Sequence, residues 1–113
     1  MTDTIFGRIA RGEIPCNKVY EDDRSVAFRD INPQAPTHIL IIPKASIETV
    51  RQIDRNPGIM DHLFTVANKI ADQEGLAEDG YRLVVNMGPA AGLSVYHLHL
   101  HLLGGRVMRW PPG

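Results

Sequence analysis

Cysteine, clustered positive charge and long apolar runs are all scarce in this sequence. Its 113 residues include a single cysteine, Cys16, which excludes an intramolecular disulfide and a zinc site built on paired cysteines. The 12 basic and 13 acidic side chains nearly balance and form no basic tract, so nucleic-acid binding is not expected. No apolar run approaches a membrane span, and Met1-Thr2-Asp3-Thr4 offers neither the basic region nor the apolar stretch of a secretion signal, so none is expected. We therefore expect a cytoplasmic protein that contacts no membrane and forms one domain, residues 1–113.

Caps, breakers and the spacing of apolar residues predict an α+β fold with a mainly antiparallel sheet. Strands are expected at residues 18–21, 25–29, 37–42, 81–86 and 94–103. Helices are expected in three places: a short one capped by Asp3 or Thr4 and ended by Gly12, a brief one at 47–52 capped by Ser46, and a long one from Asn56-Pro57 to Gly75. His62, on the long helix, matches no motif and is expected at the surface.

The run His97-Leu98-His99-Leu100-His101 is the most specific pattern in the chain. Because side chains alternate on a strand, the three histidines are expected on one face, with the leucines pointing into the core. Three imidazoles are costly to bury without partners, so we expect them to line an open pocket. Near neutral pH they cannot all be charged. At least one is then free to act as a nucleophile while a protonated neighbour holds phosphate oxygens.

Three interpretations of this run compete: phosphate chemistry, a metal site, and a solvated strand face without function. His-x-His is also a common spacing of metal ligands, so the pattern alone does not decide. The preceding stretch, residues 86–94, contains small residues that let backbone N–H groups approach an anion, and Ser94 adds a hydroxyl. It contains no carboxylate to complete a mixed metal shell. A phosphate pocket is therefore favoured.

The sequence resembles the histidine triad family, whose motif is His-x-His-x-His followed by two apolar residues. The resemblance is greatest to the Hint branch of purine nucleoside phosphoramidases and covers nearly the whole chain. The segments that carry it are Asp3-Thr4-Ile5-Phe6-Gly7, Glu13-Ile14-Pro15, residues 30–38, Ser94-Val95-Tyr96-His97, and the ending from Gly104-Gly105-Arg106 to Trp110-Pro111-Pro112-Gly113. Several segments in the right order are far more specific than the triad alone.

The resemblance implies a reaction and assigns roles in it. Hint proteins split the P–N bond of nucleoside 5′-phosphoramidates, such as AMP joined to an amine or to a lysine side chain. By this likeness, His99 is the nucleophile and forms a transient nucleotidyl-histidine, and His101 contacts the phosphate oxygens. His97 holds and polarises His99, partly through its backbone carbonyl, and His38 extends the proton relay. Ser94 hydrogen-bonds the bridging atom as the amine leaves.

The same likeness implies a binding site and an assembly. Asp30 is expected to bind the ribose hydroxyls, while Asn86 and the backbone near Gly92 place the phosphate. The purine slot is expected to consist of Phe6, Ile9, Ile31 and Leu40. Family members are homodimers that join their sheets, so Trp110 is expected to reach the partner's active site. No metal and no cofactor are expected.

Two functional classes stay open at this stage. One is a hydrolase of nucleoside phosphoramidates that acts through His99. The other is a purine nucleotide-binding or regulatory partner protein with little catalytic activity. The complete triad together with Ser94 favours the enzyme.

Overall fold

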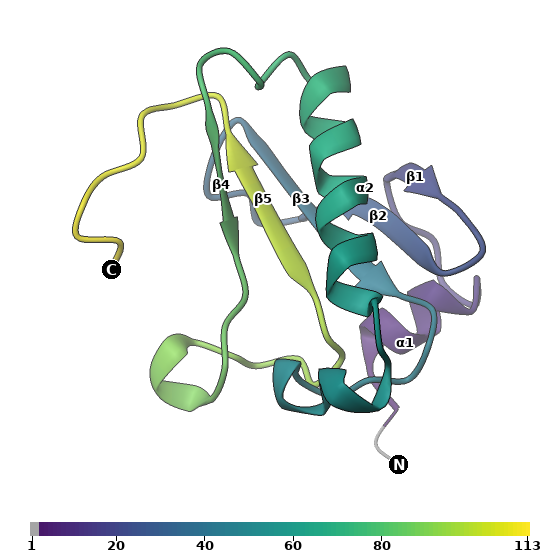
Figure 1. Cartoon of the computed structure of the whole chain (residues 1–113). Helices are drawn as coiled ribbons and strands as arrows, with labels where there is room; N and C mark the ends of the chain where they lie inside the picture. Colours follow the sequence, from purple (N-terminus) through teal and green to yellow (C-terminus); the bar gives the residue numbers. More distant parts are fainter. Residues whose placement is uncertain (1–2) are drawn as a thin grey trace.

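A five-stranded antiparallel sheet forms the centre of the protein in the computed structural model, which describes residues 3–113 (Figure 1). Its strands are β1 (Lys18–Glu21), β2 (Ser25–Arg29), β3 (Thr37–Pro43), β4 (Tyr81–Val84) and β5 (Leu100–Gly104). Their order across the sheet is β1-β2-β3-β5-β4. A meander of the first three strands thus lies beside a β4–β5 pair. The predicted α+β class with a mainly antiparallel sheet is confirmed.

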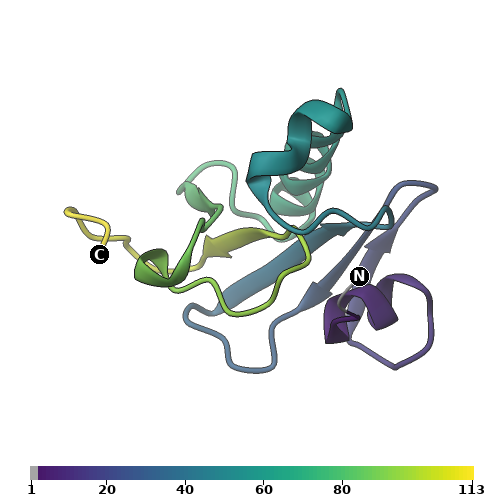
Figure 2. The same ribbon diagram turned by 90° about the horizontal axis from the view of Figure 1, so that it is seen from below.

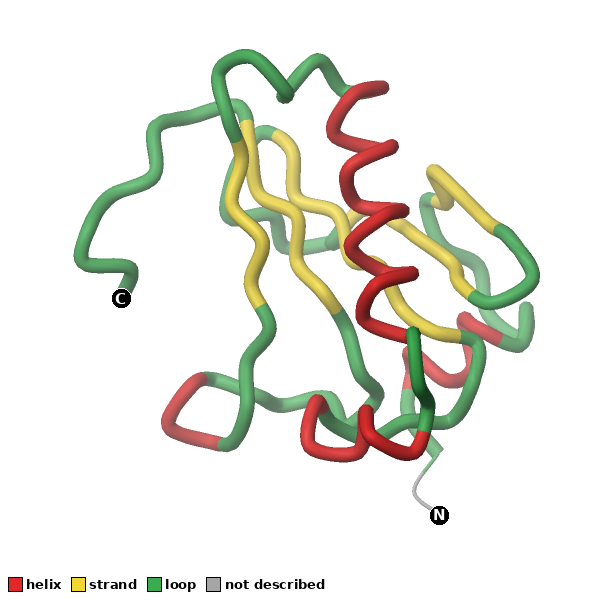
Figure 3. The backbone as a smooth tube through the Cα atoms, viewed as in Figure 1, coloured by secondary structure: helices red, strands yellow, loops and turns green. Residues whose placement is uncertain are grey.

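The helices are α1 (Ile5–Ala10), η1 (Val50–Arg55), α2 (Ile59–Gln73) and η2 (Pro89–Ala91), of which η1 and η2 are 3₁₀ turns. The Thr4 side chain accepts a hydrogen bond from the Gly7 N–H at 3.0 Å, so the predicted cap of α1 is confirmed. Figure 3 shows how short the other helical turns are beside α2, and how the loop after β5 runs outward past β4.

Two predicted helix starts are wrong. The brief helix is capped by Thr49 rather than Ser46, because Thr49 and Gln52 form a reciprocal capping box. The long helix begins at Ile59 after Gly58, whose φ of +82° is left-handed. Asn56 instead accepts the Ile59 N–H in a turn, as expected of a residue that precedes proline and so avoids the helical region.

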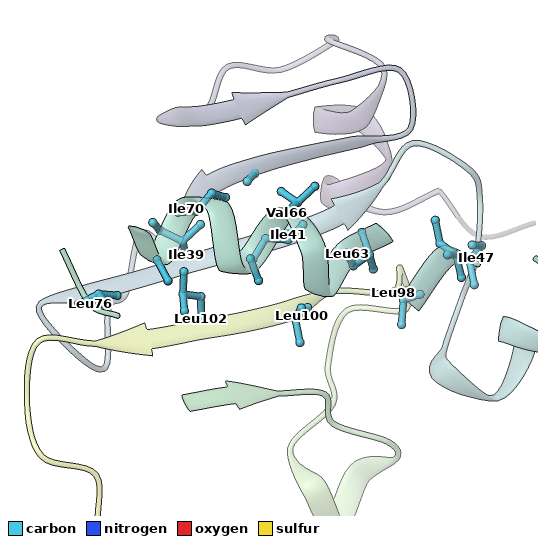
Figure 4. Packing of buried hydrophobic residues seen from close by; sticks show 14 residues of the cluster. Ile39, Ile41, Ile47, Leu63, Val66, Ile70, Leu76, Leu98, Leu100 and Leu102 are labelled. Atoms are coloured by element: carbon cyan, nitrogen blue, oxygen red, sulfur yellow. The ribbon is translucent and has the colours of Figure 1, made fainter. Parts of the chain in front are cut away.

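The sheet is covered on both faces, as the apolar composition of strand 37–42 predicts. Alternate residues of the strands face α2 and contribute to the main core. This core includes Ala27, Ile39, Ile41, Leu100 and Leu102 of the strands, Leu98 just before β5, and Leu63, Val66 and Ile70 of the helix (Figure 4). The intervening residues Val26, Phe28, Leu40 and Ile42 form a second cluster against α1. Figure 2 shows α2 and α1 on opposite sides of the sheet.

His62 is not a free surface residue as expected. Its Nε2–H donates to Asp22 Oδ2 at 2.9 Å, and Ser25 Oγ lies 3.2 Å from the same nitrogen. Asp22 also accepts from the Ser25 N–H, Ser25 Oγ and Tyr20 Oη. Burial raises the pKa of Asp22, but these hydrogen bonds outweigh it and lower the pKa overall. The cluster ties the β1–β2 turn to α2.

Within residues 3–113, no helix combines the length and the apolarity needed to cross a bilayer.

Candidate active site

The histidine run enters the sheet later than predicted. β5 begins only at Leu100, and β4 ends at Val84, which pairs with His101. Before Leu100 the chain is held differently, because the Leu98 N–H donates to the Ile47 carbonyl at 2.7 Å. At Leu98 the chain is therefore hydrogen-bonded to the loop after β3 and not yet to a strand of the sheet. Leu98, Leu100 and Leu102 are nevertheless buried in the main core, so the predicted alternation is confirmed for the leucines.

His97 is buried rather than exposed as expected for the triad, although it borders a small cavity beside Thr4 and Tyr96. Its side chain is buried, with 5% of the residue exposed, and its Nε2–H donates to the Pro43 carbonyl at 2.8 Å. Pro43 is the last residue of β3, and the backbone pairing of β3 with β5 stops at Ile41 and Leu100. The His97 side chain therefore bonds to β3 beyond the last backbone pair of the two strands. The bond satisfies the buried imidazole and removes the cost that had argued for exposure.

His99 is held with a defined tautomer. Its Nδ1 lies 2.7 Å from the His97 carbonyl oxygen, and a carbonyl only accepts, so Nδ1 carries the proton. In the neutral ring, Nε2 then keeps an unshared electron pair. The Phe6 ring and the imidazole pack in a T-shaped arrangement, with ring centroids 4.9 Å apart. Burial lowers the pKa of His99, although the His97 carbonyl acts in the opposite direction.

His101 joins the triad to the central strand. Its ring centroid is 5.0 Å from that of His99, and its Nδ1 is 2.9 Å from His38 Nε2. Burial, with smaller contributions from His99 and His38, lowers the pKa of His101 to about 4. Burial also lowers the pKa of His38, against the pull of Asp30, whose Oδ2 is 3.5 Å from His38 Nε2.

The direction of the pKa shifts does not favour the predicted protonated neighbour in the free protein. The pKa values of all four clustered histidines, His38, His97, His99 and His101, are lowered, in each case chiefly by burial. Since these pKa values lie below 6.5, the cluster is largely neutral at pH 7 and offers N–H donors and electron pairs rather than a positive charge. The reason is that the rings share a partly buried space in which added charge is poorly solvated.

Most of the predicted purine slot is assembled beside the triad. Phe6 and Ile9 of α1 pack on the cluster that contains Leu40 and Phe28, and Phe6 also touches His99. Ile31 stands apart from that cluster, with 99% of the residue exposed on the loop after β2. The sequence reasoning did not anticipate Phe28, whose ring lies 5.5 Å from that of Phe6. The alternation of apolar residues in β2 was the only available pointer to it.

Ser94, Asn86 and Gly92 lie on the β4–β5 connection that leads into the triad. Gly92 ends η2 with a φ of +90°, Asn86 is half-buried and Ser94 is exposed. Between residues 3 and 113, none of the three is hydrogen-bonded to a histidine of the cluster. Trp110 is also exposed, with Arg82 stacked over its ring at 5.9 Å. Within residues 3–113, the structure therefore places these residues on the β4–β5 connection and the C-terminal tail and shows no hydrogen bond from them to the clustered histidines.

The metal interpretation of the triad changes with the structure. In the part of the chain that the structure describes, one group of three potential ligands converges: Asp30, His38 and His101. It contains a single triad histidine, and its carboxylate comes from the loop after β2. Asp30 lies far from the triad in the sequence, so the stretch next to the triad gives no sign of this carboxylate.

Comparisons with known proteins agree with this geometry. The family model described as HIT domain matches residues 11–108. Purine nucleoside phosphoramidase from Escherichia coli (strain K12) is 56% identical over 105 residues, which are 92% of this chain and 88% of that protein. The crystal structure of a HIT family hydrolase from Legionella pneumophila Philadelphia 1 superposes with a TM-score of 0.95 at 53% identity, covering 98% of this chain and 100% of that one. This chain therefore belongs to the HIT domain family.

Proposed function

We propose that this protein hydrolyses the P–N bond of purine nucleoside 5′-phosphoramidates, such as AMP joined to an amine or to lysine. The products are the nucleoside monophosphate and the free amine. The observation that carries the proposal is the tautomer of His99, whose Nδ1–H is bound to the His97 carbonyl so that a neutral Nε2 is available. The identity to the Escherichia coli phosphoramidase supports the choice of substrate.

In the first chemical step, His99 Nε2 attacks phosphorus and the P–N bond breaks. The departing amine takes a proton from solvent water, while the Ser94 hydroxyl hydrogen-bonds the bridging nitrogen and the neutral His38–His101 pair presents an N–H to the phosphate oxygens. The nucleotidyl-histidine that forms is cationic, and the His97 carbonyl stabilises it through Nδ1–H. In the second step water attacks phosphorus, the P–N bond to His99 breaks, and the proton released from water returns to the solvent, which replaces the one that the amine took.

The surrounding residues bind the nucleotide. We propose that Asp30 accepts hydrogen bonds from the ribose hydroxyls and that Asn86 and the backbone at Gly92 place the phosphate. The purine lies against Phe6, Ile9 and Leu40, with Ile31 covering it from the loop. A flat base suits this apolar wall, and a carboxylate suits paired hydroxyls.

We propose that the active unit is a cytoplasmic homodimer of a single HIT domain, residues 1–113, that joins two sheets at β4. Among the described residues 3–113, β4 is an edge strand, with β5 as its one neighbour. The tail beside it exposes Val107 at 87% and Trp110 at 81%, which are high values for large apolar side chains. Trp110 would then reach the partner's active site. Light scattering after gel filtration should give twice the 12.6 kDa chain mass, whereas a monomer would contradict the proposal.

The test of the enzyme uses an adenosine 5′-phosphoramidate and EDTA, with release of AMP as the readout. We expect turnover by the wild type and none by His99→Ala. His62→Ala, which removes the one histidine outside the cluster, is the matched control and should keep its turnover. Tight nucleotide binding without turnover would instead support a binding protein, and loss of turnover in EDTA would support a metal enzyme.

A further inference from the structure

The loop between β2 and β3, residues 30–36, controls a proton in the active site through its backbone. The Gln34 peptide N–H donates to His38 Nδ1 at 3.1 Å. A backbone N–H is always a donor, so His38 Nδ1 must offer its electron pair. The proton of the neutral His38 ring is thereby placed on Nε2.

This placement passes from ring to ring. His38 Nε2 lies 2.9 Å from His101 Nδ1, so the protonated Nε2 donates and His101 Nδ1 accepts. The proton of neutral His101 then sits on its own Nε2. His101 meets a phosphate oxygen with an N–H in this tautomer, whereas the other tautomer would present a repelling electron pair.

The same logic decides whether the converging Asp30, His38 and His101 hold a metal ion. A histidine ligand offers an electron pair at the coordinating nitrogen and normally donates its other N–H to an acceptor. His38 has the opposite arrangement, because Nε2 carries the proton and Nδ1 faces a donor. The group is therefore a hydrogen-bond chain, and the Gln34 N–H opposes metal coordination through His38.

Arg106 holds the loop in position from the other end of the chain. Its Nε and Nη2 donate to the Gln34 carbonyl at 3.1 and 3.0 Å. Such a two-point contact restrains direction as well as distance. The Gln34 side chain adds a hydrogen bond to the Asn32 carbonyl at 3.0 Å.

We propose that the Gln34 peptide N–H and the Arg106 side chain are positioning groups. Together they set the proton on His38 Nε2, orient His101 as an N–H donor to phosphate and keep metal ions from this group. The effect on turnover rests on the proposed hydrolase function, whereas the tautomers and the exclusion of metal are measurable without it.

The direct test is ¹⁵N NMR of the histidine side chains in the full-length wild-type protein at pH 7.5, where long-range couplings distinguish the two tautomers. We expect the proton on Nε2 in His38 and in His101, and on Nδ1 in His99. Excess Zn²⁺ should leave the His38 nitrogen resonances unchanged. A proton on His38 Nδ1, or coordination of Zn²⁺ through His38 Nε2, would overturn the proposal.

Two pairs of variants separate the backbone contact from general effects on the loop. Gln34→Pro removes the N–H, while Gln34→Ala keeps it and is the matched control. We expect kcat/KM to fall about tenfold in the first, with a mixture of His38 tautomers, and less than about twofold in the second. Arg106→Ala should lower kcat about threefold with little change in KM, whereas Arg51→Ala, at another exposed arginine, should not. Equal activities and unchanged tautomers within each pair would refute the positioning role.

Discussion

The replacement His97→Ala tests whether this imidazole serves the fold or the chemistry. The side chain is buried, with its Nε2–H bound to the Pro43 carbonyl, whereas the contact to His99 comes from the His97 backbone. Truncation leaves a buried carbonyl without its donor, at a cost of about 1–3 kcal/mol. The space vacated by the ring adds about 2 kcal/mol in lost packing. We therefore expect the free energy of unfolding to fall by about 3–5 kcal/mol.

For a domain of this size, that loss corresponds to a decrease in Tm of roughly 12–20 °C. Below the unfolding transition, kcat/KM for an adenosine phosphoramidate should fall less than about tenfold, because the backbone carbonyl remains in place. His97→Gln retains a side-chain N–H donor and should recover about half of the lost stability. Urea titrations and initial rates supply the two readouts. A variant within about 1 kcal/mol of wild type, or a stable variant more than about a hundredfold less active, would refute the reasoning.

Three further predictions concern the histidine cluster, Asp22 and the close packing of Gly104 against Leu76. In the folded protein, the pKa values of His38, His97, His99 and His101 lie below the ordinary 6.5, so the unfolded chain binds more protons in mild acid. The urea concentration at the midpoint of unfolding should therefore fall as the pH is lowered from 6.5 towards 4. A midpoint that stays constant over this pH range would contradict the pKa shifts. Asp22→Ala should lower the free energy of unfolding in urea by about 2–3 kcal/mol, because Ser25 and His62 lose a charged acceptor. A decrease below about 0.5 kcal/mol would show that the hydrogen bonds of Asp22 do not stabilise the fold. Gly104→Ala would bring a Cβ to 2.6 Å from Leu76 Cδ1 and should cost about 1–3 kcal/mol, which a Tm equal to wild type would disprove.

Local patterns predicted most of the elements because their causes lie within a few residues. The cap at Thr4 and the alternation of Leu98, Leu100 and Leu102 depend only on neighbouring residues and the period of a strand. The predicted start of the last strand, residue 94, is wrong for a different reason. There the Leu98 N–H finds the Ile47 carbonyl, a partner that no local pattern identifies.

The candidate site shows the same division. The three histidines and Ser94 stand out in the sequence, and the family resemblance added His38 and Asp30. The hydrogen bonds that set their tautomers run to Pro43, Gln34 and the His97 carbonyl, which are contacts of the folded backbone. The direction of the pKa shifts depends on burial, which composition does not reveal for a polar run.

The strand order has a consequence for how the protein acquires activity. The meander β1-β2-β3 and the β4–β5 pair each join strands of one half of the chain, whereas the contact of His38 with His101 spans 63 positions. Closing so long an interval carries an entropic penalty that the local hairpins avoid. We expect each half to gain structure before β3 pairs with β5. In a refolding experiment, turnover should therefore recover later than the circular dichroism signal. The recovery of turnover would then report the rate at which β3 and β5 come together.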